Sequence, residues 1–416
     1  MQSELTATTL NSLEAFEQNA ARWNRLWETS TAYEATSRSE AIALWVRTFG
    51  DPNHFRAVIV ESPTGDLLAG IALMVKSSCG LKKLTLPVNE WINCGELIVS
   101  AEASDPDDVV RLIAEQLQAE GDVLEFDRIR FEAPHWRCLA DQLQRQDQRL
   151  DVSRVQRVGL IDIGNDWEQY FQALSGNHRS AVRRSEKKVR KSGEVRLLRL
   201  LNPDDAALHQ WMRQAFEIEH RSWKGTAGSS ILAAGIDGYF LQEAINAQDC
   251  GMLDLWFLLL DDQPIAFEYC HLVKGNCHSY KIGYDEKFKA VGPGRLLRKM
   301  QLEYLTDRDN QDVNVSTHVL DTMGLLCHAK AKWVTRDYRI GRMAVSLSMP
   351  GRLILAGQQA LRKIKNRVRP QHNEQAEIKL GGASFASAEN PPNSSTIPFR
   401  SLPAFPSTEN NPVVEK

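Results

Sequence analysis

Residues 277–305 read CHSYKIGYDEKFKAVGPGRLLRKMQLEYL, and this stretch decides the fold. Its first residues, Cys277 to Tyr284, are apolar and aromatic and predict a strand, whereas Arg295 to Asp307 predict a helix. Gly292-Pro293-Gly294 predicts the turn between them, because Gly permits close backbone approach and Pro fixes the turn. Such a turn presents bare N–H groups at a helix N-terminus, where the helix dipole adds partial positive charge. The stretch therefore predicts a diphosphate site.

The elements around this turn form an antiparallel meander. A Gly-x-Gly pair on its own is more often a plain turn, so the surrounding order carries the prediction. The strands expected up to the turn are Leu253–Leu260, Ile265–Val273 and Cys277–Tyr284. The elements expected after the helix are a short strand Val313–Thr317, a helical piece Leu325–Trp333 and a closing strand Arg342–Ser348.

This order resembles the GCN5-related N-acetyltransferase (GNAT) superfamily. In that superfamily the loop after the fourth strand has the form Gln/Arg-x-x-Gly-x-Gly/Ala and binds the pyrophosphate of acetyl-coenzyme A. Lys289, Gly292 and Gly294 occupy those positions, with Lys in place of Gln or Arg. The resemblance implies acetyl-CoA or another acyl-CoA as cosubstrate. It also implies that the fourth strand polarises the thioester carbonyl, and it adds these coenzyme contacts: Ile282, Gly283, Val291 and Arg295.

Two shorter motifs narrow the resemblance. The run Tyr-Lys-x-x-Tyr-Asp-x-x-Phe from Tyr280 and the motif Trp223-Lys-Gly225 resemble the CelD-like branch of acetyltransferases. Those proteins are often encoded with cellulose or exopolysaccharide genes and are related to the FemAB double-GNAT proteins. The resemblance implies acetyl transfer to an amine or hydroxyl of a sugar or cell-envelope precursor. The alternatives are FemAB-type transfer from aminoacyl-tRNA and a non-catalytic accessory protein of a polysaccharide synthase.

The first part of the chain repeats the same order of elements. A hairpin of Phe55–Val60 and Leu67–Val75 precedes a strand at Leu81–Pro87, a helix capped near Asp105 and a strand at Val123–Phe131. No Gly-x-Gly opens onto that helix. We expect an α/β fold with a mixed sheet (α+β) and two tandem GNAT-like domains, at residues 1–153 and 154–349, of which the second binds the coenzyme. The first would shape the acceptor cleft or serve as a plain structural domain.

Composition restricts the class of protein. The net charge is −3, and the seven cysteines are scattered without a C-x-x-C pair, which indicates reduced thiols. No apolar run reaches the roughly 18 residues of a membrane span, and no export signal is visible. We expect a cytoplasmic enzyme, with attachment to the inner membrane face as an alternative. No metal is expected, because His271, Cys277 and His278 lack a fourth ligand at suitable spacing.

Two basic segments predict surfaces. Residues 178–191 could bind a phosphate-bearing acceptor or could be a solvated family feature, and the lack of interleaved aromatic residues argues against nucleic acid. Residues 350–372 predict a basic amphipathic helix whose apolar face holds Leu353, Ile354, Leu361, Ile364 and Val368. That helix would lie on the membrane beside a polysaccharide synthase or dock on its own domain. The tail at 373–416 is expected to be disordered.

Acetyl transfer needs a base for the nucleophile and an acid for the departing thiolate. Glu268 and Asp285 are the candidate bases, with an outward-facing carboxylate and a loop-shaping carboxylate as their plain alternatives. The helical piece where many GNAT enzymes carry an acid Tyr has Cys327 and His328 instead. One of these, Tyr284, Tyr280 or solvent would then protonate the thiolate. Candidate residues of the acceptor pocket are His220, Trp223, Tyr280 and Asp321.

Overall fold

The computed structural model describes residues 5–32, 34–78, 80–146, 148–307, 317–368 and 380–381. The expected strand at Val313–Thr317 lies outside these residues except for Thr317. The expected tail at 373–416 also lies outside them, apart from Leu380 and Gly381. Among the described residues, no helix has the length and apolar character needed to cross a membrane.

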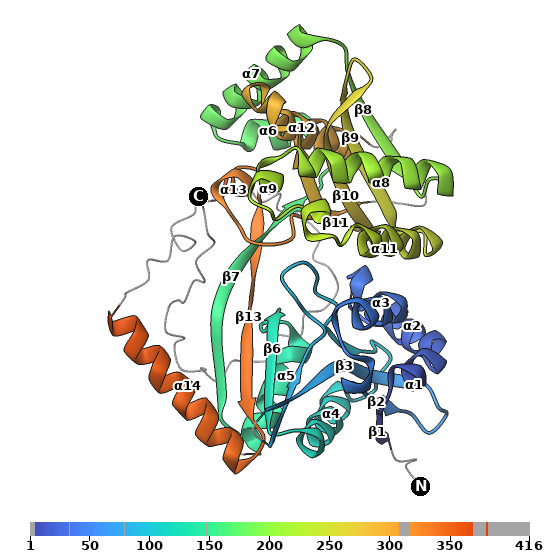
Figure 1. The fold of residues 1–416 in the computed structure, drawn as a ribbon, viewed down its shortest axis with the longest axis vertical. Helices are drawn as coiled ribbons and strands as arrows, with labels where there is room; N and C mark the ends of the chain where they lie inside the picture. Colours follow the sequence, from blue (N-terminus) through green and yellow to red (C-terminus); the bar gives the residue numbers. More distant parts are fainter. Residues whose placement is uncertain are drawn as a thin grey trace.

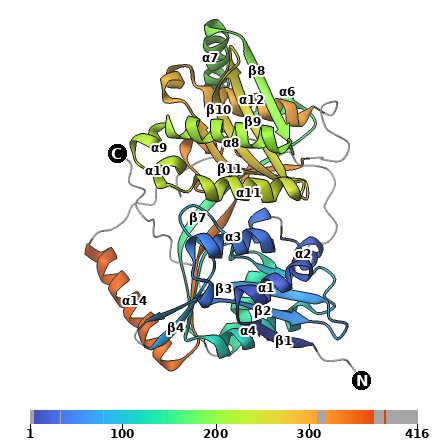
Figure 2. The ribbon, with the colours of Figure 1, turned by 45° about the vertical axis from the view of Figure 1, so that its right-hand side comes forward.

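One mixed sheet runs through the whole chain (Figures 1 and 2). Its strand order is β1-β2-β3-β4-β6-β13-β7-β12-β11-β10-β9-β8, with β5 paired to β3. The first-half strands are β1 (Thr6–Leu10), β2 (Phe55–Glu61), β3 (Leu67–Ser78), β4 (Leu81–Thr85), β5 (Leu97–Val99) and β6 (Val123–Ile129). The second-half strands are β8 (Val195–Leu201), β9 (Leu253–Leu260), β10 (Gln263–Val273), β11 (Asn276–Tyr284) and β12 (Val319–Asp321). Only the pairs β4–β6 and β11–β12 are parallel, so each half has one parallel crossover.

Two long strands join the halves. β7 (Leu150–Asp162) and β13 (Arg336–Ser346) pair with each other along most of their length. On the outer sides, β13 pairs with β6 of the first half and β7 pairs with β12 of the second half. The strand expected at Arg342–Ser348 is therefore the later part of a longer strand, and it lies in the sheet of the first half. The division of the chain at residue 153 remains a proposal, and that residue lies inside β7.

The helices cover both faces of the sheet (Figure 1). The first half has α1 (Leu13–Gln18), α2 (Ala20–Thr29), η1 (Ala35–Ser37), α3 (Ser39–Phe49), η2 (Pro52–His54), α4 (Pro106–Glu120) and α5 (Pro134–Arg145). The second half has α6 (Trp167–Ala173), α7 (Gly176–Ser192), α8 (Asp205–His220), α9 (Trp223–Thr226), α10 (Ile231–Ala234), α11 (Asp237–Asp249), η3 (Glu286–Val291), α12 (Pro293–Thr306) and α13 (His328–Ala331). The helix after β13, α14 (Met349–Val368), packs against the first-half sheet. The predicted meander and the helices at residues 106–120 and 293–306 are thus confirmed. The helical piece expected at Leu325–Trp333 is limited to α13.

A shared apolar core holds the halves together. One buried cluster combines residues of α1–α3 with residues of α8, α11 and one face of β9 and β10. The rings of Phe49 and Tyr239, one from each half, lie 4.9 Å apart. Lys274, in the turn between β10 and β11, donates to three carbonyls of the first half at 2.7–2.9 Å, those of Trp27, Ser30 and Ala32. These contacts fix the first half against the strands that lead to the predicted site.

Candidate functional site

The turn before α12 leaves a helix N-terminus open. Asp285 starts the turn, because its carboxylate accepts from the Lys287 amide at 3.1 Å and caps η3. Gly292 follows with φ +73°, a left-handed conformation that favours Gly, and Pro293 is the first residue of α12. No side chain caps α12, and the exposed Gly294 amide has no backbone acceptor among the described residues. This N-terminus can accept an anion from solvent.

The basic helix α7 lies beside this turn. Arg295 donates to the Ser185 hydroxyl at 2.8 Å, and the Lys188 ammonium lies 3.4 Å from the Ala290 carbonyl. Val182 and Val189 of α7 are buried, so a narrow apolar stripe is enough to hold the helix in place. The basic run at residues 178–191 therefore lies along one side of the predicted diphosphate turn. Lys289, which the resemblance aligns with the family's Gln or Arg, is exposed and pairs with Glu286 at 2.7 Å.

Among the described residues, no strand pairs with the outer edge of β11 beyond its first residues. β12 pairs with β11 only at residues 276–278, so the two strands part after that point. The Asp285 amide donates to the Ile265 carbonyl, and the alternation of an antiparallel pair then turns the amides and carbonyls of Ile282 and Tyr284 away from β10. The Ile282 amide has no acceptor among the described residues. The opening places backbone groups of Ile282 and Tyr284 where an extended chain could pair with them.

A β-bulge lies at the start of this opening. The register shifts between Tyr269 and Cys270, so Tyr280 is an extra residue in β11. As a result the side chains of Tyr280 and Lys281 lie on the same face, and both contact the ring of Phe240. Bulges commonly re-aim side chains beside active sites. Here the bulge turns two consecutive polar side chains toward the first half.

Lys281 bridges to the first half. Its ammonium donates to the Trp91 carbonyl at 2.9 Å and lies over the ring of Phe240 at 4.6 Å. Burial, followed by the nearby charge of Lys224, lowers the pKa of Lys281 to about 7. This residue can therefore lose its proton near neutral pH. Lys281 belongs to the run that begins at Tyr280, but the sequence offers no reason to assign it a role. The burial that lowers its pKa involves the other half of the molecule.

The Trp223-Lys-Gly225 motif forms α9 and meets the open edge. The Lys224 ammonium donates to the Ile282 carbonyl at 2.9 Å and pairs with buried Glu219 at 2.7 Å. A Cβ on Gly225 would lie 1.8 Å from the His220 carbonyl oxygen, so only Gly fits there. The motif therefore positions a cation at the outer edge of β11, a role that the sequence did not reveal. Trp223 is 56% exposed.

The two candidate bases are both ion-paired. Glu268 is buried, and its carboxylate accepts from Arg298 of α12 at 2.8 Å. Asp285 is buried and accepts from Arg221 at 2.8 Å in addition to the Lys287 amide. Asp285 therefore shapes the loop, as expected of a structural carboxylate and not of a free base. Glu268 faces α12, whereas Tyr269, the next residue, belongs to the core that faces the first half.

The remaining candidates lie around the junction of the halves or at the surface. Asp321 is buried at the end of β12, and the Tyr338 hydroxyl donates to it at 2.9 Å. Burial, followed by the charges of Glu96 and Asp321, raises the pKa of Glu34 well above its usual range. Glu34 and Glu96 come from the first half, so sequence reasoning had no local signal that joined them to Asp321. His220 lies 2.9 Å from the Ser230 hydroxyl, with Nδ1 as its nearest atom.

Cys327 and His328 are exposed, and neither contacts another candidate residue in the described contacts. Tyr284 packs near the turn, where a Cβ on Gly294 would lie 3.6 Å from its ring. Burial and the charge of Glu286 raise its pKa. The described residues contain no group of three or more His, Cys, Asp or Glu side chains suited to a metal ion. His271 instead pairs with Glu243 at 2.8 Å inside the core.

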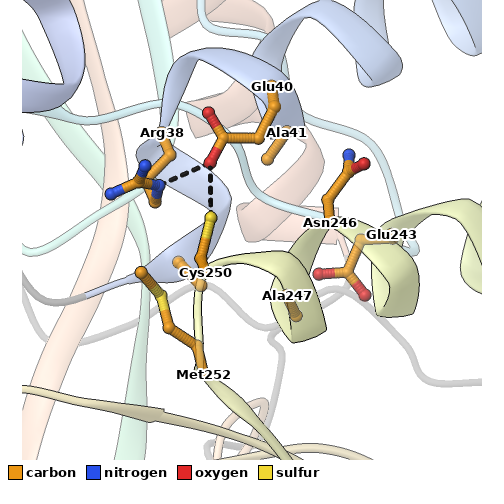
Figure 3. A pocket seen from close by; sticks show the side chains of 9 residues that line it. Arg38, Glu40, Ala41, Glu243, Asn246, Ala247, Cys250 and Met252 are labelled. Carbon is orange, nitrogen blue, oxygen red and sulfur yellow. Dashed lines mark hydrogen bonds and ion pairs between the residues drawn. The ribbon is translucent and has the colours of Figure 1, made fainter. Parts of the chain in front are cut away.

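A small pocket lies between the halves, away from the turn (Figure 3). It is lined by Arg38 and Glu40 of the first half and by Cys250 and Met252 of the second. Glu40 accepts from Arg38 and from the Cys250 thiol, the latter at 3.2 Å. These polar groups satisfy one another, so the pocket belongs to the contact between the halves.

Comparisons with known proteins agree with this geometry. Residues 176–314 match a family described as an acetyltransferase (GNAT) domain, and this range includes α7, β11 and the start of α12. No curated protein matches the sequence. The structure is similar to that of FemX, with a TM-score of 0.52 and 9% identity over 78% of this chain and 95% of FemX.

A conserved protein of unknown function from Bacteroides thetaiotaomicron is similar in structure, with a TM-score of 0.51 and 9% identity. That match covers 82% of this chain and all of the other chain, 100%. At these identities the likeness concerns the fold. The chain therefore has a mixed α/β fold like that of these structures, and its residues 176–314 match the GNAT acetyltransferase domain family.

Proposed function

We propose that the protein transfers an acyl group from an acyl-coenzyme A to an amine or hydroxyl acceptor on a sugar or cell-envelope precursor. The observation that carries this proposal is the uncapped N-terminus of α12, flanked by the basic helix α7 and continuous with the open edge of β11. A helix N-terminus of this kind is a ready-made binding site for a diphosphate. An acyl arm needs an unpaired strand edge next to it, and the chain offers both within a few residues.

The donor site is argued from three groups. The amides at the start of α12, with Gly294 exposed, would hold the diphosphate. Arg295 and Lys188, both at the turn, would add charge for the phosphates. The outward amide and carbonyl of Tyr284 and the outward carbonyl of Ile282 would pair with the amide groups of the pantetheine arm, which leaves the Ile282 amide for the thioester carbonyl. The Ile282 carbonyl already accepts from Lys224, so that ammonium would shift or share its contact when a donor binds.

The chemistry follows from where these groups point. The acceptor nitrogen or oxygen attacks the thioester carbonyl, a C–N or C–O bond forms, and the C–S bond breaks. The Ile282 amide would donate to the oxyanion that develops on the carbonyl oxygen. Lys281 is the base that we favour for the acceptor proton, because it lies next to Ile282 on the strand and its pKa is lowered to about 7. Glu268 and Asp285 remain the alternatives, and each would first have to leave its arginine. The thiolate takes its proton from Tyr284, Tyr280 or water.

A second candidate is aminoacyl transfer from a charged tRNA, as in the FemAB alternative. The fold likeness to FemX and the basic surface of α7 support it. In this reading the same turn and α7 would bind the RNA backbone instead of a free diphosphate. The acyl carbonyl and the acceptor would occupy the same places along β11.

The test offers both donors to the same protein. We would incubate it with acetyl-CoA, with longer acyl-CoAs and with a pool of aminoacyl-tRNAs, each with a panel of amino sugars and polyols, and detect acylated products by mass spectrometry. Product from an acyl-CoA that disappears in Gly294→Asp supports the proposal. Product from charged tRNA alone would replace it with the second candidate. No product from either donor, with no donor binding, would contradict both.

A further inference from the structure

The helix α14 exposes an apolar face away from the protein. Gly351 and Leu355 are buried among residues 349–361, where the exposure of its side chains is described, and Leu355 packs against Val123 and Ala344 of the first-half sheet. On the outward side, Leu353 is 75%, Met349 68%, Leu361 69% and Ile354 38% exposed. A helix on the surface of a protein in water normally presents polar residues on that side. Figures 1 and 2 show α14 on the outside of the molecule in both views, following the end of β13.

This exposure is concentrated. Outside α14, the large apolar side chains that are exposed among the described residues are Trp223, Leu232 and Ile282, which lie in the second half. The four on α14 lie on one helix within thirteen residues, from Met349 to Leu361. Contiguous apolar surface of this kind marks an interaction site. The helix therefore does more than dock on its own domain.

The positive charge of α14 indicates which kind of partner its exposed apolar face would bind. The helix carries five basic residues and no acidic residue, although the whole chain has a net charge of −3. The basic residues are Arg352, Arg362, Lys363, Lys365 and Arg367. An apolar face combined with clustered positive charge suits a lipid surface whose headgroups are anionic. It suits a second copy of the chain poorly, because two such helices would bring ten like charges together.

We propose that α14 binds the surface of an anionic lipid bilayer, with Met349, Leu353 and Leu361 inserted among the headgroups. The helix lies parallel to the bilayer plane and attaches the protein peripherally. The proposal is independent of the proposed function, because it concerns a helix that follows the last strand and shares no residue with the α12 turn. Acyl transfer in solution would be unaffected by its failure.

The experiment is co-sedimentation of the full chain with two kinds of vesicle, phosphatidylcholine alone and phosphatidylcholine mixed with phosphatidylglycerol. We expect binding to the mixed vesicles and at least about tenfold weaker partitioning to the neutral ones, since apolar and electrostatic contributions act together. Leu353→Glu with Leu361→Glu should abolish the binding. Both side chains are exposed, so the double variant should keep the melting temperature of the wild-type protein.

The matched control is Leu232→Glu, which places the same charge on an exposed leucine of α10 and should bind vesicles as wild type does. Arg362→Gln with Lys363→Gln and Lys365→Gln should weaken binding and flatten its salt dependence. Equal sedimentation of the wild type and the α14 double variant would overturn the proposal. So would a dimer in solution that the double variant dissociates, with no vesicle binding, because the apolar face would then be an interface between copies.

Discussion

The two halves build the same strand-to-helix junction in opposite ways. In the first half α4 begins at Pro106, and the carboxylate of Asp105 accepts from the amides of Asp107 and Asp108, both at 3.1 Å. In the second half α12 also begins at a Pro, but Gly292 precedes it and no side chain caps the helix. The strand after α4, β6, pairs in parallel with β4, and the strand after α12, β12, pairs in parallel with β11. The helix N-terminus is capped by a carboxylate in the first half and has no side-chain cap in the second.

The surroundings strengthen this difference. Three aspartates, Asp105, Asp107 and Asp108, put negative charge at the start of α4, and negative charge satisfies a helix N-terminus. The start of α12 instead has Gly294 exposed and Arg295 and Lys188 nearby. An internal carboxylate and an external phosphate compete for the same amides. The start of α12 thus leaves the Gly294 amide without an acceptor among the described residues, whereas the first half uses the corresponding amides to stabilise α4.

The largest effect should come from making α12 resemble α4. Gly294→Asp places a carboxylate in the first turn of α12, at the position that Asp107 has in α4, where it would repel a diphosphate. We expect the affinity for acetyl-CoA to fall by about 100-fold or more, because close like charges cost several kcal/mol. Isothermal titration calorimetry measures this. Gly294→Ala is the control, since a Cβ there meets only the Tyr284 ring at 3.6 Å. An aspartate variant that binds acetyl-CoA as wild type does would refute the site.

The next largest effect concerns Lys281, the proposed general base, which belongs to β11 of the second half. Lys281→Met should lower kcat by about 10² to 10³, the usual contribution of a general base, while acetyl-CoA affinity stays unchanged. In the wild type the neutral amine is the active form, so kcat/KM should rise with pH up to about 7 and level off above it. Lys281→Arg cannot lose a proton near neutral pH and should be as inactive as the Met variant. Full activity of the Arg variant would remove Lys281 from the reaction.

A smaller effect should come from the basic surroundings of the turn. Lys188→Gln with Arg295→Gln should weaken acetyl-CoA binding by about tenfold, and the loss should shrink at high salt because exposed charges are screened. Titrations at low and high ionic strength check this. Lys289→Gln is the comparison variant, because Lys289 is exposed, pairs with Glu286, and stands where the GNAT pattern has Gln or Arg. A larger loss in Lys289→Gln than in the double variant would contradict the assignment of the phosphate contacts.

The smallest effect is expected in the first half. Asp105→Ala removes the cap of α4 and should lower the free energy of unfolding by about 1 kcal/mol, as measured in urea. Acetyl-CoA affinity should not change, because α4 has no ligand role. Binding of a second acetyl-CoA to this variant would show that the first half differs from the second by its cap alone.

Most of the fold could be predicted from the sequence, because local patterns specify it. The runs at Leu253–Leu260 and Val123–Phe131 and the helix cap at Asp105 have short-range signals, and the strands and helix form where expected. The course of β13 could not be predicted. Its first residues, Arg336 to Ile340, include exposed polar side chains, and its pairing with β6 depends on a strand some 200 residues earlier in the chain.

The candidate site divides in the same way. The turn at Gly292 follows from a local motif, and it forms where the sequence predicts it. Ile282 is named from the GNAT resemblance, and its role remains a proposal. Lys281 and Glu34 owe their shifted pKa values to burial where the halves meet, which no local pattern encodes. The ion pairs of Glu268 with Arg298 and of Asp285 with Arg221 also join distant segments. Carboxylates that the sequence offers as bases are for that reason already engaged.

The most direct test of the account compares two donors that differ only beyond the pantetheine arm. Calorimetric titration with acetyl-CoA and with S-acetylpantetheine, which lacks the diphosphate, measures what the α12 turn contributes. In the wild type, the account predicts that S-acetylpantetheine binds at least about tenfold more weakly than acetyl-CoA. In Gly294→Asp, the two donors should bind with the same low affinity. Equal affinity for the two donors in the wild-type protein, or no affinity for any acyl-CoA, would contradict it.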